Sequence, residues 1–176
     1  MNRKYEFTGE EKLFYGRTLK RIKAKISFGN VVQGEVGGWI EKEENLSEYD
    51  DAWVYGNAEV YGNAKVCGDA EVCGNAEVYG NAKVYGNAKV CGDAEVCGDA
   101  WVIKTRHTIS FTKVGSRNDT LTAFRTKTGF SIKIGCFLGS LELFLEKVQE
   151  THGDNQFAKE YRLIAEVIKA RFEVEE

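Results

Sequence analysis

The segment Gly115–Thr122 is the most chemically dense stretch of the chain, with an arginine, an amide, a carboxylate and several hydroxyls close together. A guanidinium binds carboxylates and phosphates through two parallel hydrogen bonds, and hydroxyl and amide groups can complete such a shell. The segment therefore predicts a site for a small anion. The candidate ligand-binding residues are Ser116, Arg117, Asn118, Asp119, Thr120 and Arg125. The same stretch also fits a polar turn stabilised by Asn118 and Asp119, and both interpretations stay open.

Catalytic chemistry finds little support in the residue types and their spacing. The order of Ser, Cys, His and Asp along the chain fits no catalytic triad. Neither a Walker loop nor a Gly-x-Gly-x-x-Gly motif opens a predicted helix. Cys-x-x-Cys spacing, which is typical of zinc sites, is absent as well. We therefore predict no catalytic residues, no metal and no cofactor.

The five cysteines are Cys67, Cys73, Cys91, Cys97 and Cys136. Four of them occupy one position of a repeat, where tyrosine alternates with cysteine, so this position indicates a preference for size. The odd number of cysteines, together with an N-terminus that lacks the apolar stretch of a signal peptide, predicts free thiols in a cytoplasmic protein.

The amino-acid composition limits the kinds of partner that the chain is expected to bind. Hydrophobic residues make up 43% and charged residues 29%, which is the balance of an ordinary soluble protein. The formal net charge of −3 lacks the basic excess expected of a protein that binds duplex nucleic acid directly. Apolar runs are all shorter than the roughly 18 residues needed to cross a bilayer, so we expect no membrane partner.

A six-residue repeat, Ala-x-Val-(Tyr/Cys)-Gly-(Asn/Asp), runs from Ala52 to Ile103. Its valines are Val54, Val60, Val66, Val72, Val78, Val84, Val90, Val96 and Val102. Alanine and valine two residues apart point to the same side of an extended strand. Glycine followed by Asn or Asp is typical of turns, because both tolerate positive φ. Each repeat is therefore predicted to be a short strand followed by a corner.

One such strand cannot bury its Ala-Val face alone, whereas three repeats can close a triangular coil of about 18 residues. Successive coils would stack at roughly 4.8 Å through parallel strands. The repeats predict a mainly β chain with a parallel β-helix of about three coils.

The repeat resembles that of the hexapeptide-repeat left-handed β-helix superfamily. Val54–Glu59 matches its motif at the aliphatic and small positions, and departs from it at the second position, which carries Tyr or Cys. The left hand of the coil is implied by this resemblance alone, since the spacing of the repeat predicts only a coil.

More narrowly, the chain resembles a group of phage and gut-bacterial hexapeptide proteins, some of them labelled transferases on their fold alone. The resemblance lies in Tyr5–Glu10, Gly37–Glu41, the repeats, Gly115–Thr120 and Thr151–Asp154. For a phage-encoded member, it implies a location in the cytoplasm of the host.

Acyltransferases of the superfamily use a histidine on or near the coils and a loop that protrudes between repeats. Here His107 and His152 both lie outside the repeats, and no repeat carries an insertion. The related γ-class carbonic anhydrases need three histidines for zinc, and this chain has two. Acyl transfer therefore stays the least favoured alternative.

The segments on either side of the repeats must close the open ends of the helix. We predict an N-terminal β-rich cap over residues 1–44, with strands at 4–8 and 18–24, and the β-helix over residues 45–105. Residues 106–176 are predicted to form an α+β domain of three strands (107–114, 120–126 and 130–134) and two helices. Ser140 and Asp154 are the expected N-caps of the helices, and Gly153 is the expected end of the first.

The outward position of each repeat forms columns of residues 18 apart. An acidic column on one face and a basic column on the next would be complementary between the subunits of a closed ring, which predicts a homotrimer. A solvated surface without partners is the alternative. The candidate interface residues are Glu59, Glu77, Glu95, Lys65, Lys83 and Trp101.

Three functions follow from these features. The first is a non-catalytic homo-oligomeric binding protein whose C-terminal domain takes a small anionic ligand, with sequestration of a host nucleotide signal by a phage protein as its concrete version. The second is a structural or protein-interaction module that contacts a host protein. The third is a hexapeptide acyltransferase.

Overall fold

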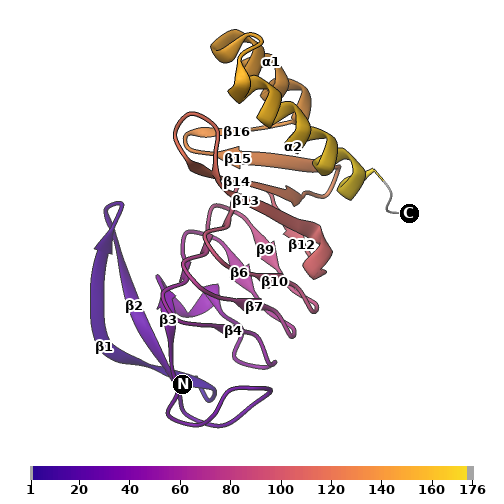
Figure 1. The fold of residues 1–176 in the computed structure, drawn as a ribbon. Helices are drawn as coiled ribbons and strands as arrows, with labels where there is room; N and C mark the ends of the chain where they lie inside the picture. Colours follow the sequence, from indigo (N-terminus) through magenta and orange to yellow (C-terminus); the bar gives the residue numbers. More distant parts are fainter. Residues whose placement is uncertain (1, 174–176) are drawn as a thin grey trace.

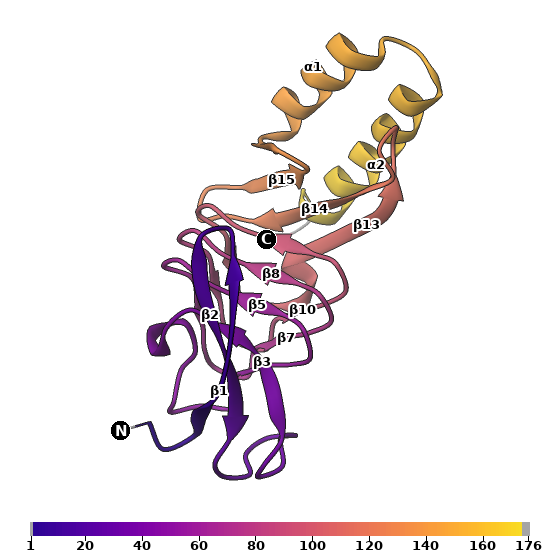
Figure 2. The ribbon, with the colours of Figure 1, turned by 90° about the vertical axis from the view of Figure 1, so that its left-hand side faces the viewer.

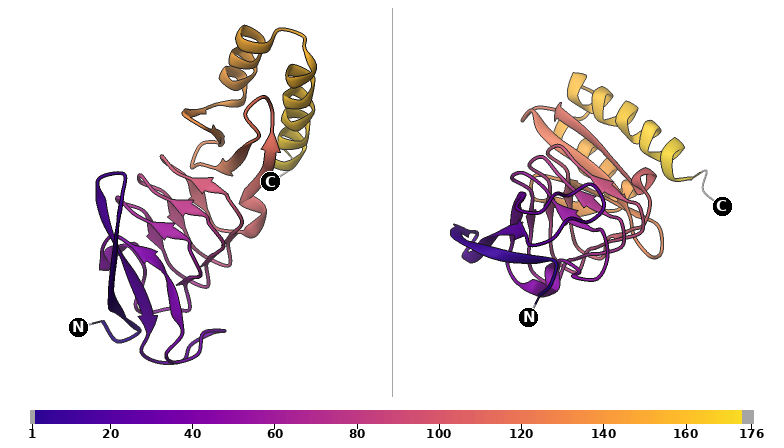
Figure 3. Two further views of the ribbon diagram at one scale, coloured as in Figure 1. Left: turned by 60° about the vertical axis from the view of Figure 1, so that its left-hand side comes forward. Right: turned by 90° about the horizontal axis from the view of Figure 1, so that it is seen from below.

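The computed structural model describes residues 2–173 as a mainly β chain with a parallel β-solenoid of about four turns (Figure 1). The solenoid and the C-terminal α+β domain follow one another along an elongated molecule, and the hairpin of the N-terminal cap lies beside the coils (Figure 3). The predicted mainly β architecture, with its coil and two flanking segments, is confirmed.

The solenoid is built from two-residue strands, one for each repeat. They are β4 (Trp53–Val54), β5 (Glu59–Val60), β6 (Lys65–Val66), β7 (Glu71–Val72), β8 (Glu77–Val78), β9 (Lys83–Val84), β10 (Lys89–Val90), β11 (Glu95–Val96) and β12 (Trp101–Val102). Residues 18 apart pair in parallel, as Val60 does with Val78, and this register gives the sheets β5-β8-β11, β4-β7-β10 and β6-β9-β12. Every third repeat therefore lies on the same side of the coil.

The alanines and valines of the repeat fill the interior, where nearly all are fully buried. The backbone pairs between coils, and the Tyr55 N–H donates to the Val72 carbonyl at 2.7 Å. The corners need glycine: Gly86 has φ +63°, and an added Cβ would lie 2.5 Å from the Ile103 carbonyl oxygen. Glycine, which has no Cβ, is thus required at this corner because the next coil leaves no room for one.

The cap contains the strands β1 (Tyr5–Phe14), β2 (Arg17–Ala24) and β3 (Val36–Ile40). The first two form an antiparallel hairpin beside the coils, and β2 pairs with β3 (Figures 1 and 2). Strand β3 then pairs in parallel with β5, so it already belongs to the solenoid. This explains the additional turn. Gly38 replaces the usual alanine because an added Cβ would lie 2.5 Å from the Ala58 carbonyl oxygen, and the repeat pattern therefore misses this turn.

The cap also covers the first coil of the repeats. Trp53 is an outward residue of its repeat but is fully buried, packed edge-on by Tyr5 and Phe28. The Lys4 ammonium is buried beside it and donates to the carbonyls of Ser47 and Ala52 at 2.7 and 2.6 Å. Burial lowers the pKa of Lys4 to about 8, although Asp50 acts in the opposite direction.

The C-terminal domain has a sheet of β13 (Thr108–Val114), β14 (Asp119–Arg125), β15 (Phe130–Ile134) and β16 (Phe137–Gly139), in that order. The helices α1 (Leu141–His152) and α2 (Gln156–Phe172) cover one face of it. Strand β16 adds one strand to the predicted three, because its three residues are too short to show a periodic pattern. Among the described residues, no helix combines the length and apolarity needed to cross a bilayer.

The predicted helix ends are confirmed except for one cap. The Ser140 hydroxyl accepts the Leu143 N–H, and Gly153 follows the last turn of α1. The cap of α2 is Asn155, whose Oδ1 accepts the Ala158 N–H at 3.0 Å. Asp154, the predicted cap, instead pairs with Arg162 at 3.1 Å. Either residue suits an N-cap, and the tight turn after Gly153 decides between them.

Strand β14 closes the last coil of the solenoid. The Thr122 hydroxyl accepts the Glu95 N–H at 3.1 Å, and Lys133 forms an ion pair with Glu95 at 2.8 Å. Phe124 is fully buried within the core of the solenoid. The C-terminal domain is therefore attached to the solenoid through a shared core as well as through polar contacts.

The prediction of five free thiols is wrong, because Cys73 and Cys91 form a disulfide. These residues stack in successive coils with their Cα atoms 4.6 Å apart, which lies within the range that a disulfide requires. Cys67, Cys97 and Cys136 are free. The repeat that brings like residues together thus also brings this pair of thiols into bonding distance.

We expect a thiol-reactive label to modify three cysteines per chain after unfolding without reductant, and five after reduction. Cys73→Ala should lower the free energy of unfolding of the oxidised protein by about 3 kcal/mol, because the bond closes a loop in the unfolded chain. Cys67→Ala is the matched control, since Cys67 has the same repeat position but no disulfide. Mass spectrometry of the labelled chain gives the count, and five labels without reductant would contradict the bond.

Candidate functional site

A pocket of about 190 Å³ lies where three separate segments of the C-terminal domain meet, and it is called the polar pocket because most of its lining residues are of polar types. They are the β13–β14 turn, the β15–β16 turn and the end of α1, with α2 forming one wall. Strand β13 points away from the solenoid, so its turn lies at the far end of the molecule (Figure 2). The lining residues are Ser116, Arg117, Asp119, Ile134, Gly135, Cys136, Phe137, Thr151, His152 and Tyr161.

The β13–β14 turn is shaped by its contact with α2. Gly115 has φ +67°, and an added Cβ would lie only 1.7 Å from the Tyr161 hydroxyl oxygen. Its N–H donates to Glu160 Oε2 at 2.8 Å. Asn118 has φ +52°, a conformation that asparagine tolerates better than most residues. The turn therefore lies directly on Tyr161 and directs Ser116 and Arg117 to the pocket.

Two side chains of opposite charge, Asp119 and Arg117, approach Gly135. A Cβ added there would lie 3.1 Å from Asp119 Oδ2 and 3.7 Å from Arg117 Nη1. Burial, and then the charges of Glu160 and Asp119, raise the pKa of Tyr161, while Arg117 opposes this shift. The Tyr161 hydroxyl therefore stays protonated at neutral pH and can donate a hydrogen bond to a ligand.

Four polar members of this pocket were not predicted from the sequence. Cys136 comes from the β15–β16 turn, Thr151 and His152 come from the last turn of α1, and Tyr161 comes from α2. His152 is the last residue of α1, and its ring lies 5.8 Å from that of Tyr161. One signal was present: 115–120 and 151–154 both belong to the segments that carry the family resemblance, and here they line one pocket.

Three of the predicted ligand-binding residues lie outside the pocket lining. Asn118 supplies the positive φ of the turn, and the Thr120 N–H donates to Asp119 Oδ1 at 2.8 Å. Arg125 is at the opposite end of β14, where its guanidinium donates to the Phe172 carbonyl and lies 5.2 Å from the ring of Phe172. Arg125 therefore does not line the pocket with Arg117, because β14 extends for about 20 Å between its two ends.

A second cavity of about 120 Å³ adjoins the first. The two share Ile134, Phe137, Thr151, His152 and Tyr161. The second cavity adds Phe144, Val148 and Lys147 to this lining. The combined site thus has a polar end at Arg117 and an apolar, aromatic end between Phe137 and Phe144.

The acidic column of the solenoid is largely neutralised within the chain. Glu59 forms an ion pair with Lys12 of the cap, and Glu95 forms one with Lys133. Between them, Glu77 accepts a hydrogen bond from the Tyr61 hydroxyl at 2.8 Å. An acidic face of this kind offers less charge to a neighbouring subunit than the sequence pattern alone implied.

The basic column is more open. Lys65 and Lys83 are exposed, and the Lys83 ammonium lies 4.9 Å from the ring of Trp101. The Lys127 ammonium lies over the same ring at 4.7 Å. The exposed lysines of this face could contact an acidic partner, but the Trp101 ring at its end already contacts the ammonium groups of Lys83 and Lys127.

His107 is part of the structure at the end of the solenoid. The imidazole is buried, and its Nδ1 accepts the Ile103 N–H at 3.3 Å. Within residues 2–173, no group of three or more His, Cys, Asp and Glu side chains is arranged to hold a metal ion.

No protein-family model matches the chain, and no curated protein matches it in sequence. The function of the chain is therefore inferred from the geometry of the pocket.

We expect Glu77→Gln to raise the melting temperature at neutral pH. Burial raises the pKa of Glu77, an effect that the Tyr61 hydrogen bond opposes, so the folded protein favours the protonated carboxyl. This contribution is fully present below the pKa of the unfolded chain, about 4.3, and is lost as the pH rises through the folded pKa. The advantage of the variant should therefore disappear on acidification.

Thermal unfolding between about pH 4 and 7 measures this difference. Glu71→Gln is the control, because Glu71 has the equivalent outward position but forms an ion pair with Lys89 at 2.9 Å. A lower melting temperature for Glu77→Gln at neutral pH would show that the hydrogen bond from Tyr61 outweighs the cost of burial.

Proposed function

We propose that this protein is a non-catalytic binding protein whose C-terminal pocket takes a small anionic ligand. The solenoid is the stalk that carries the pocket. The observation that supports the proposal is the convergence of Arg117, the protonated Tyr161 hydroxyl, Ser116, Thr151 and His152 on one cavity from separate segments. Concave sites with a few convergent polar groups are the usual places for small ligands.

The size of the cavity limits the ligand. About 190 Å³ is below the roughly 300–1,000 Å³ of pockets that enclose a drug-sized molecule, so the polar end suits one phosphate or carboxylate group. The adjoining cavity, with Phe137 and Phe144, suits a flat or apolar group. A nucleotide combines these two parts, and sequestration of a host nucleotide signal by a phage protein in the host cytoplasm is the concrete form of the proposal.

Asp119 adds a requirement for a hydrogen-bond donor on the ligand. Its carboxylate lies beside the Arg117 guanidinium, as their shared approach to Gly135 shows. A carboxylate repels a simple anion but accepts from a hydroxyl or an amine. The favoured ligand therefore carries an anionic group and a donor close to it, as a ribose phosphate does.

A protein partner is the second candidate function. At the tip of the β1–β2 hairpin, Leu13 is 79% exposed and Tyr15 is 82% exposed. Apolar side chains that project together from a hairpin tip are typical of protein contact sites. The homotrimer predicted from the columns is an alternative assembly, with weaker electrostatic support because Glu59 and Glu95 have partners in their own chain.

We expect Arg117→Ala to weaken binding of an anionic ligand by about 10-fold to 100-fold, the loss typical of a charge-assisted hydrogen bond. Arg125→Ala is the control, because Arg125 lies at the other end of β14 and should affect stability but not affinity. Native mass spectrometry of freshly purified protein identifies any bound ligand by mass. Calorimetric titration with inorganic phosphate, mononucleotides and cyclic nucleotides then gives the affinities.

Absence of binding across this panel, with no adduct in the native spectrum, would contradict the anionic ligand and favour the protein partner. An adduct that survives Arg117→Ala unchanged would move the site away from this pocket. Loss of affinity in Arg125→Ala, without loss in Arg117→Ala, would do the same.

A further inference from the structure

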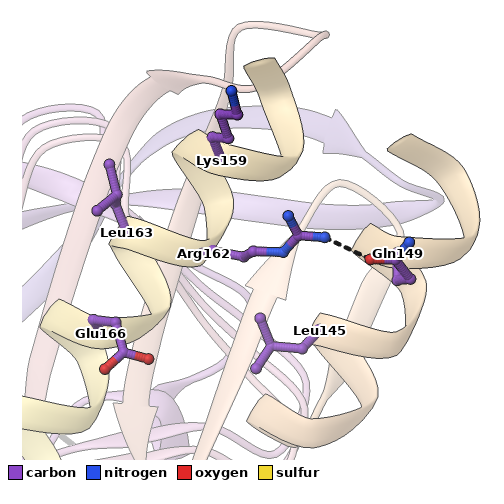
Figure 4. Close-up of a pocket in the computed structure, with 6 residues that line it drawn as sticks. All are labelled: Leu145, Gln149, Lys159, Arg162, Leu163 and Glu166. Carbon is purple, nitrogen blue, oxygen red and sulfur yellow. Dashed lines mark hydrogen bonds between the residues drawn. The ribbon is translucent and has the colours of Figure 1, made fainter. Parts of the chain in front are cut away.

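A groove of about 690 Å³ runs between α1 and α2 (Figure 4). Its lining residues are Leu145, Gln149, Lys159, Arg162, Leu163 and Glu166. The two helices turn Phe144, Val148, Tyr161 and Ile168 to the sheet, and the groove residues lie on other faces of the same helices. This groove is therefore separate from the polar pocket, with which it shares no lining residue.

The floor of the groove is braced by Arg162. Its guanidinium reaches from α2 to Gln149 of α1, as Figure 4 shows, and also donates to the Gly153 carbonyl at 2.9 Å. An ion pair with Asp154 completes these contacts. Because these contacts hold the Arg162 guanidinium against α1, they fix the distance between α1 and α2. The groove is therefore formed before any partner binds.

Helix α2 carries a second apolar ridge beside the groove. Leu163 is 69% exposed and Val167 is 47% exposed, and residues four apart lie on the same face of a helix. A surface helix normally exposes polar residues on the side opposite its buried stripe. This helix is instead apolar on both sides, which indicates a surface that another helix covers.

The charges around Leu163 indicate which partner fits. Lys159 lies four residues before Leu163, and Glu166 lies three residues after it, both on the groove side. When two copies of one helix cross antiparallel about Leu163, the lysine of each lies opposite the glutamate of the other. A two-fold interface must be self-complementary in this way, whereas a foreign partner has no such requirement.

Both charges are available for such a contact. Within residues 2–173, Lys159 has no ion-pair partner. Glu166 pairs with Lys169 one turn further along the helix at 3.0 Å, and exposed pairs of this kind contribute little to stability. Exchanging Lys169 for a lysine of a second copy therefore costs little.

We propose that the groove between α1 and α2 is a homodimer interface, in which the Leu163–Val167 ridge of each copy lies in the groove of the other. The two helix pairs form a four-helix layer around a two-fold axis near Leu163. The contact leaves the solenoid faces and the polar pocket uncovered. It is independent of the proposed ligand, since its residues are not those of the pocket.

Sedimentation equilibrium over a range of concentrations tests this interface on the full chain. The expected result is a monomer–dimer equilibrium for the natural sequence, lost in Leu163→Glu. Lys159→Glu alone and Glu166→Lys alone should each weaken the dimer by 10-fold or more, because each places like charges opposite one another. The double variant K159E/E166K should restore the dimer, because the charges are then complementary again.

Lys147→Glu and Glu150→Lys are the matched controls. These two residues form an exposed ion pair three residues apart on α1, as Glu166 and Lys169 do on α2, but they lie outside the groove. Neither control should change the association. A monomer at every concentration would overturn the proposal. A dimer or trimer that Leu163→Glu leaves intact would also overturn it and would direct attention to the solenoid columns. Circular dichroism of each variant verifies that the exposed substitutions leave the fold unchanged.

Discussion

Backbone hydrogen bonds between coils hold each residue of the solenoid above the residue 18 positions away, at the spacing of neighbouring strands in a sheet, and the other features of the structure follow from this register. Identical side chains must stack, so the interior accepts only the small and branched residues that fit one layer thickness. The same stacking places the rings of Tyr61 and Tyr79 parallel at 5.0 Å and brings Cys73 to Cys91. It also stacks glutamates, which is unfavourable unless other groups neutralise them.

The flanking segments compensate for these costs. The cap and the C-terminal sheet close the exposed backbone edges of the first and last coils, which would otherwise invite aggregation. Each also contributes a lysine to one end of the glutamate column, Lys12 at Glu59 and Lys133 at Glu95. The flanking segments thus stabilise the solenoid through polar pairing as well as through burial, and the C-terminal domain is fixed to the stalk by the same contacts.

In the proposed function, this attachment carries both candidate sites at the far end of the C-terminal domain. The polar pocket lies at the loop end of the sheet, and the groove lies between the helices that cover it. A small ligand and a second copy of the chain can therefore occupy the domain at the same time. In the proposed arrangement, the dimer would present two pockets on a common helical layer, with the two solenoids extending from it.

The sequence by itself determined the solenoid, because a period of six with alanine, valine and glycine in fixed places has one way to bury its apolar face. It also determined the helices and most of their ends, through stripes such as Leu141–Val148 and caps such as Ser140. Tertiary structure decided the first turn, which lacks the repeat because Gly38 lies against Ala58, and the Cys73–Cys91 bond, which depends on two side chains meeting across a coil. Tertiary structure also separated Arg125 from Arg117 and brought Cys136 and His152 to the pocket. The spacing of residues along the chain does not predict where a strand ends or which distant loops come together.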